Sequence, residues 1–217
     1  MHPYKISLLI ADDHPLFRAG VKQTLERLEA VEFYEAEEGN KALQIIRDLA
    51  PDVAVIDLRM PGKTGLEILS GLCESGNTTK IILLTMYKNI NYFYQAVSLG
   101  AKGYLLKETA VQDLIEAVKT VYDGGTFISS RLKSIIKSEK PDEYQNKLLI
   151  ESVNTLTITE REIMKLLSEW KTNCEIAHTL FNSVRTIENH RANISDKLNL
   201  HGAHNLIKFA IENRELF

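Results

Sequence analysis

Through the first 125 residues, short runs of Val, Ile and Leu alternate with stretches of helical periodicity. The runs show little alternation of apolar and polar residues, as is typical of parallel strands that are buried on both faces. The clearest candidate strands are Ile6–Ala11, Val53–Asp57, Ile81–Thr85 and Gly103–Leu106, with a weaker one near Val31–Ala36. Five strands alternating with five helices predict a doubly wound, five-stranded parallel sheet of the α/β class.

The chain changes character after Gly124 and Gly125. The next stretch is rich in Ser, Lys and Glu and shows little periodicity, which predicts a linker that is helical in part around Leu132–Ile136. From Thr157 onward, apolar residues recur at helical spacing. We therefore expect an α/β domain over residues 1–125, a linker over 126–152 and a smaller all-α domain over 153–217.

Composition indicates the cellular compartment of the protein but does not identify its partners. The 217-residue chain has a formal net charge of −3, which points neither to nucleic acid nor to a membrane. No apolar run approaches the roughly 18 residues of a membrane span. The two cysteines, Cys73 and Cys174, form no metal or redox motif. Because isolated thiols fit a reducing compartment, we expect a cytoplasmic protein that does not enter the membrane.

Charged and polar residues follow the predicted strands at the same end of each strand. Asp12 and Asp13 follow the first strand, Asp57 and Thr85 end the third and fourth, and Lys107 follows the fifth. Sites in open α/β sheets form at the carboxyl ends of the strands, so these side chains should meet in one pocket. Three carboxylates repel one another unless a cation joins them, and Mg²⁺ suits a site with few protein ligands. Such a pocket favours attack of a carboxylate on a phosphoryl group.

Each of these residues also has a simpler interpretation. Asp13 could cap the helix that begins near His14, Asp57 could be a strand-end turn residue, and Lys107 could be a solvated surface charge. His14 itself is better explained as a first-turn helix residue than as a ligand. The shared position at one end of several strands favours the pocket over these separate explanations.

Three segments of this region resemble the receiver domains of two-component response regulators. They read IADDHPLFRAG from residue 10, DLRMPGKTGLEIL from residue 57 and KGYLLKE from residue 102. The resemblance covers about the first 125 residues. It implies a flavodoxin-like fold and a phosphoryl group donated by a partner histidine kinase.

The same resemblance implies a role for each residue of the pocket. Asp57 would be the phosphoacceptor, Lys107 the phosphate-binding lysine, Thr85 the switch hydroxyl and Tyr104 the switch aromatic. Met86 departs from the pattern, because a small residue often follows the switch hydroxyl, and its bulk could restrict access to the phosphorylated site. The expected Mg²⁺ ligands are the carboxylates of Asp12, Asp13 and Asp57 and the backbone carbonyl of Arg59.

The C-terminal region resembles a second family. LTITEREIMKLLSEWKTNCEIAHTL followed by SVRTIENHRANISDKLNL is similar to the LuxR-type helix-turn-helix of the NarL/FixJ regulators. The resemblance implies a recognition helix from about Val184 to Leu198, with Ser183 well placed as its N-cap. Its apolar face is Ile187, Ile194 and Leu198. The residues expected to reach base edges are Arg185, Glu188, Asn189 and Ala192. Phosphate contacts or scaffold roles are expected of Thr186, His190, Arg191, Asn193 and Lys197.

Several positions depart from the pattern of that second family. Asn182 occupies a turn position that is usually apolar, and Val184 is apolar where a polar residue is common. Glu188 stands where many relatives carry a basic or small polar residue. An acid there repels phosphates but can accept a hydrogen bond from cytosine N4. Glu188 is therefore either a base-reading residue or a repulsive charge.

Together, the two resemblances predict a transcriptional regulator controlled by phosphorylation rather than an enzyme. Phosphorylation of Asp57 would draw Thr85 toward the phosphate, let Tyr104 move inward and bias a two-state surface. That surface would govern formation of a homodimer that binds double-stranded DNA. Two alternatives remain. One is a Mg²⁺-dependent phosphohydrolase, for which no substrate-binding cap is visible. The other is a regulator that responds to a ligand or partner instead of phosphorylation.

Overall fold

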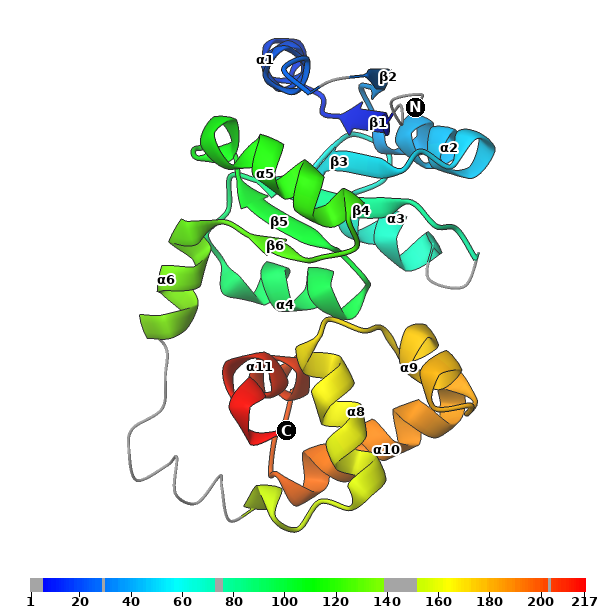
Figure 1. The fold of residues 1–217 in the computed structure, drawn as a ribbon, viewed down its shortest axis with the longest axis vertical. Helices are drawn as coiled ribbons and strands as arrows, with labels where there is room; N and C mark the ends of the chain where they lie inside the picture. Colours follow the sequence, from blue (N-terminus) through cyan, green and yellow to red (C-terminus); the bar gives the residue numbers. More distant parts are fainter. Residues whose placement is uncertain (1–5, 29, 73–75, 139–151, 203) are drawn as a thin grey trace. The chain divides into compact units, whose positions relative to one another are not determined.

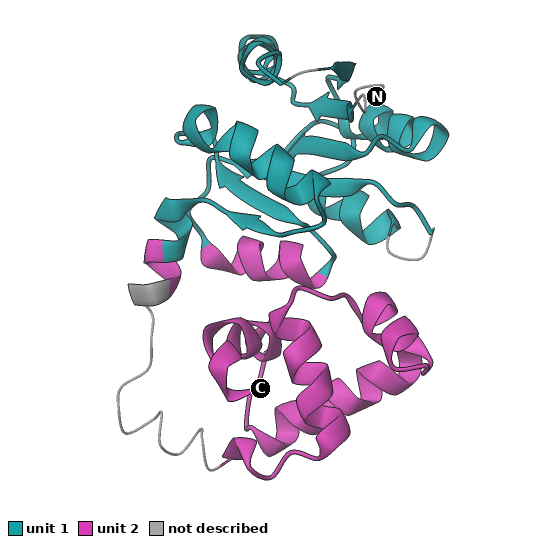
Figure 2. Ribbon diagram, in the orientation of Figure 1, with its two compact units in different colours: residues 1–89, 99–133 teal, residues 90–98, 134–217 magenta. Residues whose placement is uncertain are grey.

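The computed structural model describes residues 6–28, 30–72, 76–138, 152–202 and 204–217. Cys73 lies outside these residues. The chain divides into two compact units according to its internal contacts. One unit comprises residues 1–89 and 99–133, and the other comprises residues 90–98 and 134–217 (Figure 2). The first unit contains the sheet, and the second contains the C-terminal helices together with α4, Ile90–Ser98.

The first unit is built on a six-stranded sheet with the strand order β2-β1-β3-β4-β5-β6 (Figure 1). All of its strand pairs are parallel. The predicted α/β class and the weak strand near Val31 are confirmed. The strands are β1 Ile6–Ala11, β2 Val31–Ala36, β3 Val53–Asp57, β4 Lys80–Thr85, β5 Gly103–Leu106 and β6 Phe127–Ile128.

The sixth strand corrects the expected count of five. β6 pairs with β5, with Phe127 opposite Gly103 and Ile128 opposite Tyr104. A two-residue strand carries too little pattern to be recognised in a sequence, and the preceding glycines suggested that the sheet had ended. The sheet therefore continues into the segment expected to be a linker. Helix α6, Ser130–Ser138, follows at once and includes the stretch that was expected to be helical.

Helices of the first unit cover both faces of the sheet (Figure 1). On one face, α1, Pro15–Leu25, and α5, Ala110–Tyr122, pack against the strands through the apolar positions that repeat at helical spacing. The other face carries α2, Gly39–Leu49, and α3, Gly65–Leu72. Burying both faces leaves the carboxyl edge of the strands as the place where polar side chains gather.

The C-terminal helices of the second unit enclose a separate apolar core. They are α8 Ile158–Ser168, α9 Asn173–Thr179, α10 Val184–Lys197, α11 Asn205–Glu212 and the short 3₁₀ helix η1 Arg214–Leu216. The hydroxyls of Thr157, Thr172 and Ser183 cap the starts of α8, α9 and α10, so each helix begins where the sequence supplies an N-cap residue. Within the described residues, no helix combines the length and apolarity that crossing a membrane requires.

Candidate functional site

Four strands of the sheet bring charged and hydroxyl side chains to one edge, as predicted. Asp12 directly follows β1, Asp57 ends β3, Thr85 ends β4 and Lys107 directly follows β5. The ammonium of Lys107 lies 2.7 Å from Oδ2 of Asp12 and 2.7 Å from Oδ2 of Asp57. Asp12 is 0% exposed and Asp57 is 5% exposed. Lys107 is therefore a shared cation between two buried carboxylates and not a solvated surface charge.

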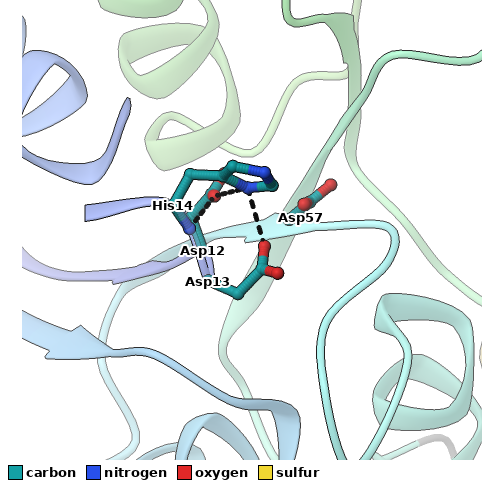
Figure 3. Close-up of side chains that lie close together, drawn as sticks. All are labelled: Asp12, Asp13, His14 and Asp57. Atoms are coloured by element: carbon teal, nitrogen blue, oxygen red, sulfur yellow. Dashed lines mark hydrogen bonds and ion pairs between the residues drawn. The ribbon is translucent and has the colours of Figure 1, made fainter. Parts of the chain in front are cut away.

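Asp13 and His14 complete an acidic cluster with Asp12 and Asp57 (Figure 3). One ligand atom from each of the four residues lies within 4.8 Å of the other three. Nδ1 of His14 is 2.8 Å from Oδ1 of Asp13 and 3.2 Å from Oδ1 of Asp12. The cluster holds three carboxylates, and Lys107 supplies one positive charge to it. The local charge therefore favours a further cation.

The simpler interpretation of Asp13 as a helix cap is wrong. His14 occupies the N-cap position of α1 and makes no side-chain cap hydrogen bond. Asp12 accepts the backbone N–H of His14 at 2.9 Å, so Asp12 orders this turn while Asp13 remains in the cluster. His14 was expected to be a first-turn helix residue and not a ligand, yet its imidazole contacts both acids that precede it. Its place directly after Asp12 and Asp13 in the sequence is the signal for this contact.

The pKa values reflect burial and the shared lysine. Burial raises the pKa of the Asp57 carboxyl, and the neighbouring Asp12 adds to the rise, while Lys107 opposes it. Burial acts to lower the pKa of Lys107, but its hydrogen bonds to the two carboxylates outweigh burial and raise that pKa. The lysine therefore stays charged, while Asp57 lacks enough positive charge nearby to offset its burial.

Thr85 and Tyr104, which are expected to act as a switch, lie on the neighbouring strands β4 and β5. Thr85 is 0% exposed, and its hydroxyl accepts the backbone N–H of Tyr87 at 3.0 Å. Tyr104 is also 0% exposed and thus already occupies the interior position toward which it was expected to move. Met86 is 70% exposed, so most of its side chain lies in solvent.

The loop after Asp57 stays close to the end of β3. The backbone N–H of Arg59 donates to Oδ1 of Asp57 at 3.4 Å, and the Arg59 guanidinium lies 4.6 Å from the centre of the Tyr87 ring. A Cβ atom on Gly65 would come within 2.9 Å of the Asp57 carbonyl oxygen. Only glycine permits this approach of α3 to the end of β3.

Helix α10 separates an apolar face from a polar one, as expected of a recognition helix. Ile187 and Ile194 are 0% exposed and Leu198, which caps the helix, is 3% exposed. The hydroxyl of Ser183 accepts the backbone N–H of Thr186 at 3.0 Å. The opposite face is exposed and carries Arg185, Glu188, Asn189, Ala192 and Asn193.

The start of α10 and the turn before it expose both charged and apolar side chains. The Arg185 guanidinium lies 3.5 Å from the Glu188 carboxylate, and the Arg185 side chain is 81% exposed. Phe181, in the preceding turn, is 97% exposed and has a φ of 52°. Val184 is 37% exposed. In the sequence, the polar Asn182 next to the apolar Phe181 indicates that this turn departs from the pattern of LuxR-type domains.

Two basic residues of α10 are held by the domain itself. Arg191 is half-buried and donates to Oδ1 of Asn173, at the start of α9. Nζ of Lys197 lies 2.6 and 2.9 Å from the carboxylate oxygens of Glu160, a residue of α8 that is 4% exposed. His190 is half-buried. These contacts favour the scaffold role over the phosphate-contact role for Arg191 and Lys197.

Comparison with known proteins matches two segments of the chain to families. Residues 8–119 match the response regulator receiver domain, and residues 154–210 match the bacterial regulatory proteins of the luxR family. The oxygen regulatory protein NreC of Staphylococcus epidermidis is 36% identical over 97% of this chain and 99% of its own length. NreC of Staphylococcus carnosus is also 36% identical over the same shares.

Solved structures of response regulators match nearly the whole length of the chain. A structure of the Salmonella typhimurium RcsB response regulator matches 95% of this chain and 98% of its own, with a TM-score of 0.59 and 25% identity. An RcsB–DNA complex matches 96% of this chain and 99% of its own, with a TM-score of 0.57 and 25% identity. This chain therefore belongs to the NarL/FixJ family of two-component response regulators, in which a phosphate-accepting receiver is joined to a LuxR-type helix-turn-helix that binds DNA.

Proposed function

We propose that Asp57 accepts a phosphoryl group from a histidine kinase, and that this event controls dimerisation and DNA binding by this transcriptional regulator. The observation that carries the proposal is the pocket formed by Asp12, Asp13, Asp57 and Lys107. An oxygen of Asp57 would attack the phosphorus of the donor while the bond from phosphorus to the donor nitrogen breaks. Lys107 would then bind an oxygen of the transferred group.

The proposed cofactor is Mg²⁺, because the donor set is rich in hard oxygen ligands and short of positive charge. The ion would be held by Asp12, Asp13, Asp57 and the backbone carbonyl of Arg59. When bound, it supplies positive charge to the oxygens of the phosphoryl group. Asp12 would also keep its contact with Lys107, which orients the ammonium toward Asp57.

The proposed switch uses the buried hydroxyl of Thr85. That hydroxyl now accepts a hydrogen bond from the backbone of Tyr87, and it would donate to a phosphoryl oxygen once Asp57 is modified. Turning toward the phosphate would change the position of the loop after β4. Tyr104 is already buried, so this switch would not require its ring to move inward. A biased two-state surface of this kind accounts for control of dimerisation.

The proposed DNA-binding surface is the exposed face of α10. Arg185, Glu188, Asn189 and Ala192 are placed to reach base edges in the major groove, while Thr186, His190 and Asn193 are left for phosphate contacts or scaffold. Support comes from the match to a regulator that was solved bound to DNA. We propose that the receiver, expected over residues 1–125, extends through β6, that the linker continues from there to residue 152, and that the DNA-binding domain spans 153–217. We also propose a cytoplasmic location, where both the kinase and DNA are accessible.

The phosphorylation proposal is tested with acetyl phosphate, with and without Mg²⁺, followed by mass spectrometry of the modified peptide. Wild type should be modified at Asp57 only when Mg²⁺ is present, and Asp57→Ala should not be modified. Asp13→Ala should need more Mg²⁺ for the same rate, because it removes a ligand from a site with few protein ligands. Equal modification of wild type and Asp57→Ala would refute the assignment. Sustained hydrolysis of unrelated phosphate esters would favour the phosphohydrolase.

The DNA-binding proposal is tested by titrating wild type and Glu188→Ala against selected and random duplexes at two salt concentrations. If Glu188 reads cytosine, its removal should weaken selected binding by roughly 1–3 kcal/mol and relax preference at one base pair. If it only repels phosphates, its removal should strengthen binding to every sequence. A wild-type protein that shows no sequence preference when phosphorylated would overturn the proposed regulator.

A further inference from the structure

The ammonium of Lys107 has a third neighbour besides its two carboxylates. The centre of the Phe17 ring lies 4.7 Å from Nζ, while Asp12 and Asp57 each lie 2.7 Å from it. The Lys107 side chain is only 6% exposed. A lysine ammonium has three N–H donors, so a ring face stands where water or another acceptor would otherwise bind.

We propose that Phe17 is a positioning residue for phosphorylation, whose ring holds the Lys107 ammonium where it meets the transferred phosphoryl group. The inference rests on the proposed function of Asp57 and Lys107. An aromatic face attracts a cation through its quadrupole, and the attraction is strongest when water is excluded. Burial of Lys107 meets that condition.

A ring suits this position better than a polar side chain. When the phosphoryl group joins Asp57, the carboxylate loses its charge and the ammonium must exchange a carboxylate oxygen for a phosphoryl oxygen. A third carboxylate would hold the ammonium back by a strong directional bond. The ring attracts the cation without a fixed hydrogen-bond direction, so it keeps Lys107 in place through the exchange.

The position of Phe17 is itself fixed by the fold. The residue lies on α1, packs against the core cluster beneath that helix and is partly buried. It also lines a hollow of about 130 Å³ between α1 and α5. The ring is therefore held by the core and still has space beside it, so fluorine atoms can replace ring hydrogens without severe overpacking.

The experiment weakens the quadrupole of the ring at position 17 while leaving the shape of the ring nearly unchanged. Phenylalanines with one, two and three fluorine atoms are placed at position 17 of the full chain, and the rate constant for phosphorylation by acetyl phosphate with Mg²⁺ is measured. The rate should fall stepwise across the series, by roughly two- to thirty-fold in total. Phe33 gives a matched control, because its ring packs against the same core cluster and lies 5.8 Å from Nζ of Lys22, outside the pocket. The same series at position 33 should leave the rate unchanged.

A second measurement separates this inference from the proposed function. Urea unfolding is measured for four proteins. Two carry Phe17 and two carry trifluorinated phenylalanine at position 17, and one protein of each pair keeps Lys107 while the other carries Lys107→Met. Fluorination should shift the unfolding midpoint more when Lys107 is present than when it is replaced. Equal shifts in both backgrounds, or equal rates across the series at position 17, would overturn the role of Phe17. Failure of wild type to be phosphorylated would instead refute the proposed function, and the unfolding comparison would still decide whether the ring holds the ammonium.

Discussion

Replacing Lys197 by alanine should destabilise the helical domain. The Lys197 ammonium lies 2.6 Å from the carboxylate of Glu160, whose side chain is 5% exposed, whereas the Lys197 side chain is 37% exposed. Removing one partner of a fully buried ion pair costs about 3–5 kcal/mol. Exposed pairs contribute about 0.2–1 kcal/mol. Because solvent reaches one partner of this pair, we expect a loss of about 1–2 kcal/mol in the free energy of unfolding.

The loss should depend on pH. Burial acts to raise the pKa of Glu160, but Lys197 and the N–H and hydroxyl of Thr157 outweigh burial and lower that pKa below its ordinary value of 4.5. A carboxyl with a lowered folded-state pKa stabilises the fold above its unfolded-state pKa, and this contribution disappears as the pH falls through the folded-state value. The difference in the free energy of unfolding between wild type and Lys197→Ala should therefore be largest at neutral pH and should shrink as the pH falls below 4.5.

Urea unfolding followed by tryptophan fluorescence measures this difference in the relevant domain. Trp170 is the only tryptophan of the chain and is 4% exposed among the C-terminal helices. Lys165→Ala serves as a control, since it removes an exposed lysine from α8. If Lys197→Ala is as stable as the control but lowers the salt slope of DNA binding by about one unit, Lys197 contacts phosphate and the scaffold argument is refuted.

Two further predictions concern other surfaces of the protein. Arg191→Ala and Asn173→Ala should each lower the stability of the helical domain by about 1–2 kcal/mol, because each breaks the same half-buried hydrogen bond. Their double mutant should cost less than the sum of the two in the fluorescence assay, and full additivity would count against a shared contact. Leu16 is 89% exposed and Val111 is 68% exposed beside the hollow between α1 and α5. Leu16→Glu should leave Asp57 phosphorylation intact but prevent dimerisation of the phosphorylated protein in sedimentation experiments, whereas an unchanged dimer would exclude this surface.

Most of the phosphorylation pocket could be predicted from the sequence, because the strands of a buried parallel sheet are recognisable from their local residue pattern. Buried strands appear as continuous apolar runs, and all carboxyl ends of parallel strands lie at one edge. Residues that end a strand, such as Asp57, or directly follow one, such as Asp12 and Lys107, must therefore meet. Helix periodicity likewise identified the buried and exposed faces of α10, because a residue's side of a helix depends only on its position along the turn.

Tertiary structure alone decided which side chains touch between elements that are distant in sequence. Lys197 and Glu160 are 37 residues apart, and nothing in the spacing of either helix indicates that the lysine is neutralised by the domain itself. The same holds for the Phe17 ring over Lys107 and for the two-residue strand β6, whose pairing with β5 gives no periodic signal of its own. Local pattern determines the direction in which a side chain leaves its element, whereas the crossing and spacing of packed elements determine what that side chain meets.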